Sequence, residues 1–419
     1  MVDLPSDAVV FVPGLGDSDA MRVAHVTELL CWEMNQQAPD RTTTFAATPT
    51  SVGTEVVHRV VRTAVDGTSV PVLDVYAYDS RTAAGPTITG TNPLAKVLTL
   101  ALTMISAILV LLGVALDWRR KAKTRVQLLQ VVVVAILVLC IVAYFVIAVI
   151  ALVDAIITLA RGSAPAPTVN LPQWIVLIGA VVGGLVPSLR EKITSVGERV
   201  VQMARFTYTG SLRNRLTGGL QDLIDRIAQR QEIEHVHVVS YSFGSLIALD
   251  TLFPHGGQPA RSMTMVDTLV TIGSPFDLIR MVRPNYPEER TLGPEVTPHW
   301  VNIYQPIDVL GSDFRNEGRR SDPVGLRGTG SEQRIPDQNL PWNPDLRLNV
   351  VNLLMLRSLS VHAGYWDDAT TARSAFEMVV RALATRPILQ AGAASRRAAS
   401  RRRAEVAEPV VDPADPAPR

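Results

Sequence analysis

Three long apolar segments interrupt this chain and constrain its architecture more than any other feature. They span residues 97–116, 126–160 and 171–187, and Asp154 is the only acidic residue within them. Apolar runs of about 18 or more residues are typical of transmembrane helices, whereas a soluble cap would need a core large enough to hide all three. The sequence therefore predicts a transmembrane helical insertion over residues 95–188, which divides a soluble domain into two parts.

The two flanking parts read as alternating strands and helices. Short apolar runs that end in glycine or polar turns predict strands at 8–13, 71–78, 235–240, 266–272 and 299–304. Longer segments between them predict helices at 18–37, 54–65, 211–231, 244–253 and 369–385. This alternation predicts an α/β fold, with a mostly parallel sheet and helices on both faces.

The remaining segments carry no apolar periodicity. Residues 40–54 are a polar stretch rich in threonine and proline, and residues 312–346, rich in glycine, proline, aspartate and arginine, predict a long loop. Residues 389–419 contain almost no large apolar side chain, which predicts a disordered tail. The soluble domain is thus expected to consist of an N-terminal part, residues 1–94, and a C-terminal part, residues 189–388.

Composition excludes several function classes. The formal net charge is +1, so no overall field favours binding to nucleic acid. Cys31 and Cys140 lie in different kinds of segment and predict neither a disulfide nor a metal-ligand cluster. Residues 1–5 lack the basic and apolar regions of a secretory signal, which favours a cytosolic setting.

The segment HVHVVSYSFGSLIALDTL carries the most specific chemical signal. An apolar strand ends at Ser240-Tyr241-Ser242-Phe243-Gly244, and a helix begins at once. A serine on so sharp a turn exposes its hydroxyl above the helix N-terminus, and small residues two positions away let the turn close. The segment resembles the nucleophile elbow of the α/β-hydrolase family, in particular of its lipase-like members, with Ser240 in place of the usual glycine. The resemblance covers about residues 5–80 and 190–385 and implies that Ser242 is the nucleophile.

The family order of serine, acid and histidine along the chain selects the partners of Ser242. His362 follows every candidate acid, and its segment HAGYWDD resembles the histidine loop of lipase-like hydrolases. Asp308 follows an expected strand in WVNIYQPIDVLGSDF, which resembles the family's acid-bearing turn. Asp277 and Asp313 are alternative acids, although both also fit ordinary loop carboxylates that cap nearby amides.

The resemblance also implies an oxyanion hole built from backbone amides. Its donors would be Phe243, directly after the nucleophile, and Leu15 in PGLGD, where Pro13-Gly14 stands at the position of the family's His-Gly. The glycines of this turn could also suggest dinucleotide binding, but the third glycine of that motif is missing, because residue 19 is Asp19. We therefore expect neither an organic cofactor nor a metal.

The membrane topology follows from the shared sheet. Two parts that supply strands to one sheet must lie on the same side of the bilayer, so the insertion must cross it an even number of times. The loop 118–125 carries five basic residues and 161–170 carries one, which favours a cytoplasmic position for the first. The simplest consistent arrangement has 126–150 and 171–187 as crossings and the hydrolase domain in the cytoplasm. A hairpin of 97–116 and 126–150 is the alternative.

Together these patterns predict a membrane-anchored serine hydrolase. It would cleave an ester or thioester of an apolar, lipid-like substrate through an acyl-serine intermediate, with the lipid bilayer and that substrate as its partners. A catalytically degenerate hydrolase fold acting as a membrane-bound binding or signalling module is one alternative. A peptidase or acyltransferase would use the same three residues. The sequence does not specify the oligomeric state.

Overall fold

The computed structural model of the protein describes most of the two parts expected to form the soluble domain. The described residues are 7–14, 20–38, 43–53, 55–80, 206–207, 210–306, 308, 310–316, 319–342, 361–362, 364–366 and 375–384. The three apolar segments and the predicted tail lie outside these residues. Within the described ranges, no helix is both long and apolar enough to cross a membrane.

A single mixed sheet organises the described part of the chain. Its strands are β1 (Asp7–Val12), β2 (Thr44–Val52), β3 (Glu55–Thr63), β4 (Ser69–Ala77), β5 (His235–Tyr241), β6 (Val266–Ile272), β7 (His299–Tyr304) and β12 (Gln338–Pro341). They lie in the order β12-β7-β6-β5-β1-β4-β3-β2. All neighbours from β12 to β4 pair in parallel, and only β4, β3 and β2 pair antiparallel. The predicted α/β class with a mostly parallel sheet is therefore confirmed.

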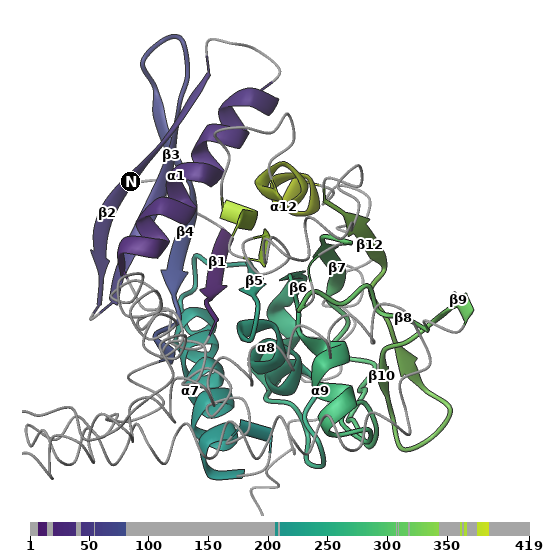
Figure 1. Ribbon diagram of the computed structural model, residues 1–419. Coiled ribbons are helices and arrows are strands. Elements are labelled where there is room, and N and C mark those ends of the chain that lie inside the picture. Colours follow the sequence, from purple (N-terminus) through teal and green to yellow (C-terminus); the bar gives the residue numbers. More distant parts are fainter. Residues whose placement is uncertain are drawn as a thin grey trace, which may run out of the picture.

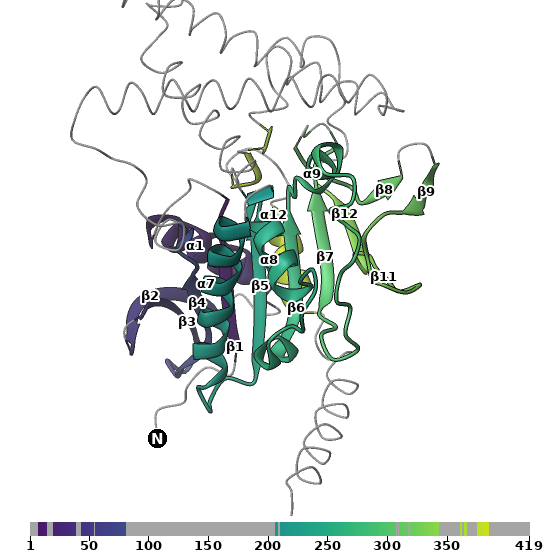
Figure 2. The same cartoon turned by 90° about the horizontal axis from the view of Figure 1, so that it is seen from below.

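Helices cover both faces of this sheet (Figure 1 and Figure 2). The helices are α1 (Ala20–Gln37), α7 (Gly210–Ala228), α8 (Gly244–Leu252), α9 (Phe276–Val282) and α12 (Ala375–Ala384). Figure 1 shows α1 and α12 above the sheet and α7, α8 and α9 below it. Strand β1 contributes side chains to the hydrophobic cores on both faces of the sheet. Ala8, Val10 and Val12 pack in one core, and Val9 and Phe11 pack in the other.

Strand β1 joins segments that are far apart in the sequence. It pairs in parallel with β4 on one side and with β5 on the other, so Phe11 lies between Ala77 and Val239. Segments from both sides of residues 81–205 therefore belong to one sheet. This arrangement places the end of β1 beside the end of β5, where the serine motif lies.

The helix predicted at residues 54–65 is wrong, because this segment is strand β3. It forms an antiparallel hairpin with β2, which occupies most of the polar stretch 40–54, and Gly53 turns the chain at a φ of 60°. Val57 and Val60 are the buried residues of β3, and their spacing of three resembles the spacing on a helix face. In the strand this odd spacing places the two side chains on opposite faces of the sheet, because Val57 packs in one core and Val60 in the other.

The long loop predicted at residues 312–346 is also wrong in part. It contains the short strands β8 (Arg315–Asn316), β9 (Arg319–Pro323), β10 (Leu326–Arg327) and β11 (Gln333–Arg334), followed by β12. Strand β12 extends the main sheet by pairing with β7, and the carboxylate of Asp337 accepts a 2.8 Å hydrogen bond from the Trp300 amide beside it. Backbone pairing and polar contacts, which also include a 2.8 Å hydrogen bond from the side-chain amide of Asn302 to Asn339 Oδ1, hold this edge, so no apolar period marks it in the sequence.

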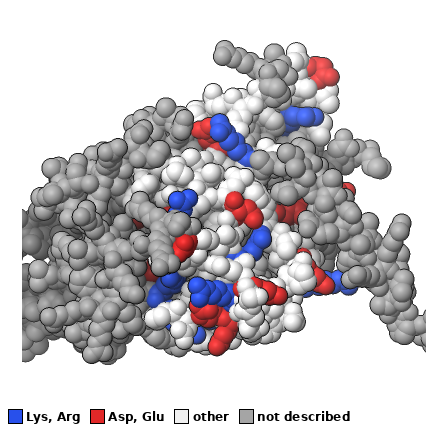
Figure 3. All heavy atoms as spheres, turned by 90° about the vertical axis from the view of Figure 1, so that its right-hand side faces the viewer, with Lys and Arg blue, Asp and Glu red and all other residues white. Residues whose placement is uncertain are grey.

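The surface of the described residues carries both charge signs. On the face drawn in Figure 3, Lys and Arg side chains lie among Asp and Glu side chains, and neither sign forms an extended patch. This face therefore lacks the continuous basic surface that tracks a nucleic-acid backbone.

Candidate active site

The strand-to-helix turn at Ser242 is the centre of the site. Strand β5 ends at Tyr241 and α8 begins at Gly244, with Ser242 between them at a φ of 51°. This left-handed conformation is unfavourable for a residue with a Cβ, so the surrounding structure must hold it. The Ser242 amide donates to the carbonyl of Ile272 at the end of β6 (2.8 Å), and its carbonyl accepts from the Ser245 amide (3.0 Å). These bonds fix the turn from both sides.

Small residues on either side of Ser242 let the turn approach β1. A Cβ on Gly244 would lie 2.2 Å from the carbonyl oxygen of Val12 and 2.5 Å from that of Pro13, so only glycine fits. Ser240 is fully buried, and its hydroxyl donates to the carbonyl of Val270 (2.9 Å). The buried serine is accommodated at this position because β6 accepts its hydrogen bond.

The structure brings Ser242, His362 and Asp308 together. Nε2 of His362 lies 2.8 Å from Oγ of Ser242, and Nδ1 lies 2.8 Å from Oδ2 of Asp308. His362 is 6% exposed and Asp308 is 2% exposed, whereas Ser242 is half-buried. In this geometry the imidazole can take the serine proton while the buried carboxylate orients the ring and stabilises its charged form.

Asp308 lies in a tight turn after β7, and donors reach both of its oxygens. Oδ1 accepts from the Leu310 amide (2.9 Å), and Oδ2 accepts from the hydroxyl of Tyr365 (3.0 Å) as well as facing His362. The Asp308 amide donates to the carbonyl of Gln305 (2.9 Å), which closes the turn. The carboxylate is therefore buried without an unsatisfied oxygen.

Two glycines make room for this carboxylate. A Cβ on Gly273, which has a φ of 55°, would lie 3.3 Å from both Asp308 Oδ2 and His362 Cε1. A Cβ on Gly311 would lie 2.7 Å from Asp308 Oδ2. The ends of β6 and of the acid-bearing turn can thus approach the His362 ring only where no side chain intervenes.

Sequence reasoning assigned no role to several of these residues. Tyr365, Gly273 and Gly311 contact the acid or the base, and Tyr241 donates its hydroxyl to the carbonyl of His362 (2.6 Å). Tyr241 and Tyr365 both lie within segments that carry a motif, SYSFG and HAGYWDD, so their position next to Ser242 and His362 was the available signal.

One predicted oxyanion donor is placed by the structure. Phe243 directly precedes α8, and its amide has no hydrogen-bond acceptor among the described residues, so it can serve an incoming oxygen. Leu15 lies outside the described residues. Gly14, its neighbour, is buried after the end of β1.

The alternative acids do not reach the histidine. Asp277 lies at the start of α9, where its carboxylate accepts a 3.0 Å hydrogen bond from Arg280, and burial raises its pKa. The side chain of Asp313 accepts from the Arg315 amide (3.1 Å). Among the described residues, Asp308 is the carboxylate in contact with the His362 ring.

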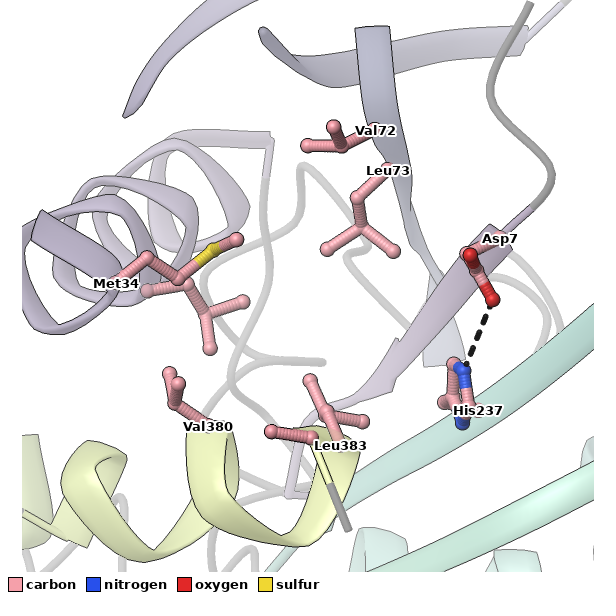
Figure 4. A pocket seen from close by; sticks show the side chains of 9 residues that line it. Asp7, Met34, Val72, Leu73, His237, Val380 and Leu383 are labelled. Atoms are coloured by element: carbon pink, nitrogen blue, oxygen red, sulfur yellow. Dashed lines mark hydrogen bonds and ion pairs between the residues drawn. The ribbon is translucent and has the colours of Figure 1, made fainter. Parts of the chain in front are cut away.

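An apolar cavity of about 180 Å³ lies away from this site, at the opposite end of the sheet. Figure 4 shows it between α1, α12 and β4, with Asp7 and His237 on its polar wall, 3.4 Å apart. The cavity is lined by Asp7, Leu30, Met34, Val72, Leu73, His237, Val380, Leu383 and Ala384. Asp7 begins β1, whereas Ser242 follows the end of the parallel strand β5, so this cavity does not contain Ser242.

Neither a metal-binding group among the described residues nor a similar known protein adds to this description. In the part of the chain that the structure describes, no group of three or more His, Cys, Asp or Glu side chains could hold a metal ion. Comparisons with protein-family models, with curated proteins and with solved structures found no match. The geometry of the Ser242 site is therefore the basis for assigning a function.

Proposed function

We propose that this protein is a serine hydrolase of the α/β-hydrolase type, with Ser242 as nucleophile, His362 as general base and Asp308 as the orienting acid. The observation that carries the proposal is the continuous contact from Ser242 Oγ through the His362 ring to Asp308 Oδ2, with 2.8 Å at each step. Such a chain on a left-handed serine between a strand and a helix has the arrangement that acyl transfer requires.

The reaction would proceed through an acyl-serine intermediate. His362 Nε2 takes the proton of Ser242 as Oγ attacks the carbonyl carbon, and the amides of Phe243 and Leu15 donate to the oxyanion. The imidazolium then gives its proton to the leaving alcohol or thiol as the bond to the carbonyl carbon breaks. Water, deprotonated by His362, attacks the acyl group, and the proton returns to Ser242 as the acid is released.

The proposed substrate class follows from the apolar segments of the sequence. An enzyme anchored by residues 95–188 would meet esters or thioesters with long apolar chains at the membrane, with the hydrolase domain on the cytoplasmic side. A peptidase or acyltransferase would share the three residues and differ in the leaving group or in the group that accepts the acyl chain.

The nucleophile is tested by covalent labelling of the full-length, detergent-solubilised protein with a fluorophosphonate probe. Wild-type protein should be labelled, and Ser242→Ala should not. Ser240→Ala is the matched control, because this neighbouring hydroxyl bonds to the Val270 carbonyl and should be dispensable for labelling. Absence of labelling in the wild type, or undiminished labelling of Ser242→Ala, would refute the assignment.

The substrate class is tested separately with nitrophenyl esters of increasing acyl length. We expect kcat/KM in lipid vesicles to rise with chain length, and the matching amides to react much more slowly than the esters. A preference for acetyl esters would reject the lipid-like substrate while leaving the serine hydrolase in place, and equal rates for amides would favour a peptidase.

A further inference from the structure

The Ser242–His362–Asp308 chain continues one step further, to Tyr365. Its hydroxyl lies 3.0 Å from Asp308 Oδ2, the same oxygen that faces His362 Nδ1 at 2.8 Å. We infer that Tyr365 is a positioning residue, whose hydroxyl holds Asp308 in the orientation that His362 needs and shares the charge of its Oδ2. The inference rests on the proposed function, because it concerns how the acid of that reaction acts.

The direction of the hydrogen bond follows from a third group. The Gln305 amide lies 2.7 Å from the Tyr365 hydroxyl oxygen and can only donate to it. The hydroxyl therefore accepts from Gln305, and its own proton is directed to the carboxylate of Asp308. Both Gln305 and Asp308 belong to the turn after β7, so Tyr365 connects the histidine segment to the acid-bearing turn in a single orientation.

Packing restricts the ring that carries this hydroxyl. Tyr365 is 1% exposed, and its ring lies 5.1 Å from that of Trp342 and 6.3 Å from that of Tyr241, measured between centroids. Gly273 lies so close that a Cβ there would be 2.9 Å from Cε2 of Tyr365. Since the ring cannot turn without displacing these neighbours, the hydroxyl stays within reach of Asp308.

The hydroxyl remains a donor throughout the working range of pH. Burial and the nearby charge of Asp308 raise the pKa of Tyr365 well above its ordinary value. Among the described residues, the other titratable groups that face the His362 ring are Asp308 and Tyr241; Tyr241 stacks on it at 5.4 Å. Removal of the Tyr365 hydroxyl would leave Oδ2 with one donor fewer, so that more of its charge would act on the His362 ring.

The test is Tyr365→Phe in the full-length protein, with the rate of fluorophosphonate labelling measured against pH. We expect the plateau rate to fall by about tenfold and the midpoint of the pH profile to move up by about 0.5 to 1 pH unit. Tyr286→Phe is the matched control, since Tyr286 is equally buried and its hydroxyl donates to Asp250 (2.8 Å), away from the site. This control should keep the wild-type midpoint.

The outcomes separate the inference from the function. A wild-type midpoint and plateau in Tyr365→Phe would overturn the positioning role, and so would equal losses in both variants with unmoved midpoints, because that pattern reflects stability alone. Wild-type protein that shows no Ser242-dependent labelling would instead refute the proposed function itself and the inference with it. Thermal unfolding of both variants shows whether the Tyr365→Phe protein is folded at the assay temperature.

Discussion

The close contact between the serine turn and β1 predicts that Gly244→Ala damages both stability and activity. The added Cβ would meet the carbonyl oxygens of Val12 and Pro13 at 2.2 and 2.5 Å and the Val12 carbonyl carbon at 2.9 Å. All three are backbone atoms, so no side chain can rotate away. Either α8 or the end of β1 must move by roughly 1 Å to restore ordinary contact.

The expected change in the free energy of unfolding combines two opposing effects. Overpacking costs about 1–3 kcal/mol, and the upper part of this range applies where only backbone can yield. Replacing a helical glycine by alanine otherwise stabilises by about 1 kcal/mol. We therefore expect the free energy of unfolding to fall by about 1–2 kcal/mol. Each kcal/mol lost lowers Tm by about 2–4 °C in a domain of this size. A displacement of about 1 Å at the nucleophile should slow labelling by about a hundredfold.

The assay compares Gly244→Ala with Gly218→Ala in thermal unfolding and in fluorophosphonate labelling. Gly218 lies within α7, and a Cβ there would meet nothing within 4 Å, so the same change should raise stability by up to about 1 kcal/mol and leave labelling unaltered. If Gly244→Ala behaved like Gly218→Ala in both measurements, the close approach of α8 and β1 would be refuted as the cause of the glycine at this position.

Three further predictions concern the site and the core. His362→Ala should slow ester hydrolysis by roughly 10⁶-fold and Asp308→Asn by roughly 10⁴-fold in steady-state assays; an unchanged Asp308→Asn rate would move the acid elsewhere. Ser242→Gly should abolish hydrolysis yet raise the thermal unfolding temperature slightly, by relieving the φ of 51°, and a lower temperature would contradict that strain. Burial alone would raise the pKa of the Asp250 carboxyl, but the charge of Arg290, 2.5 Å away, helps to lower it. The ion pair therefore stabilises the folded protein fully above the ordinary carboxyl pKa, and this stabilisation is lost as pH falls through the lowered pKa. Asp250→Asn should therefore cost about 3–5 kcal/mol at pH 7 by leaving a buried charge, and wild-type stability at pH 7 would show that the pair contributes nothing.

Local sequence was sufficient where one short segment contains the whole feature. The strand, turn and helix around Ser242 lie within residues 235–252, so apolar periodicity and the small residues Ser240 and Gly244 were enough to predict them. The parallel sheet was predictable for the same reason, because continuous apolar runs mark strands covered on both faces. Periodicity misled at β3, where Val57 and Val60 face opposite cores but have the spacing of three that a helix face would show. It also missed strands in residues 312–346, where backbone pairing forms strands without an apolar period.

The tertiary structure decided what depends on distance across the chain. Asp277, Asp308 and Asp313 were all compatible with the order along the sequence, and only the turn after β7 carries its carboxylate to the His362 ring, at 2.8 Å. The sequence places Tyr365 near His362, but its contact with Asp308, 57 residues away, is visible only in the structure. Sequence patterns record which face of an element is apolar, whereas the pairing of buried polar atoms depends on how strands and turns pack.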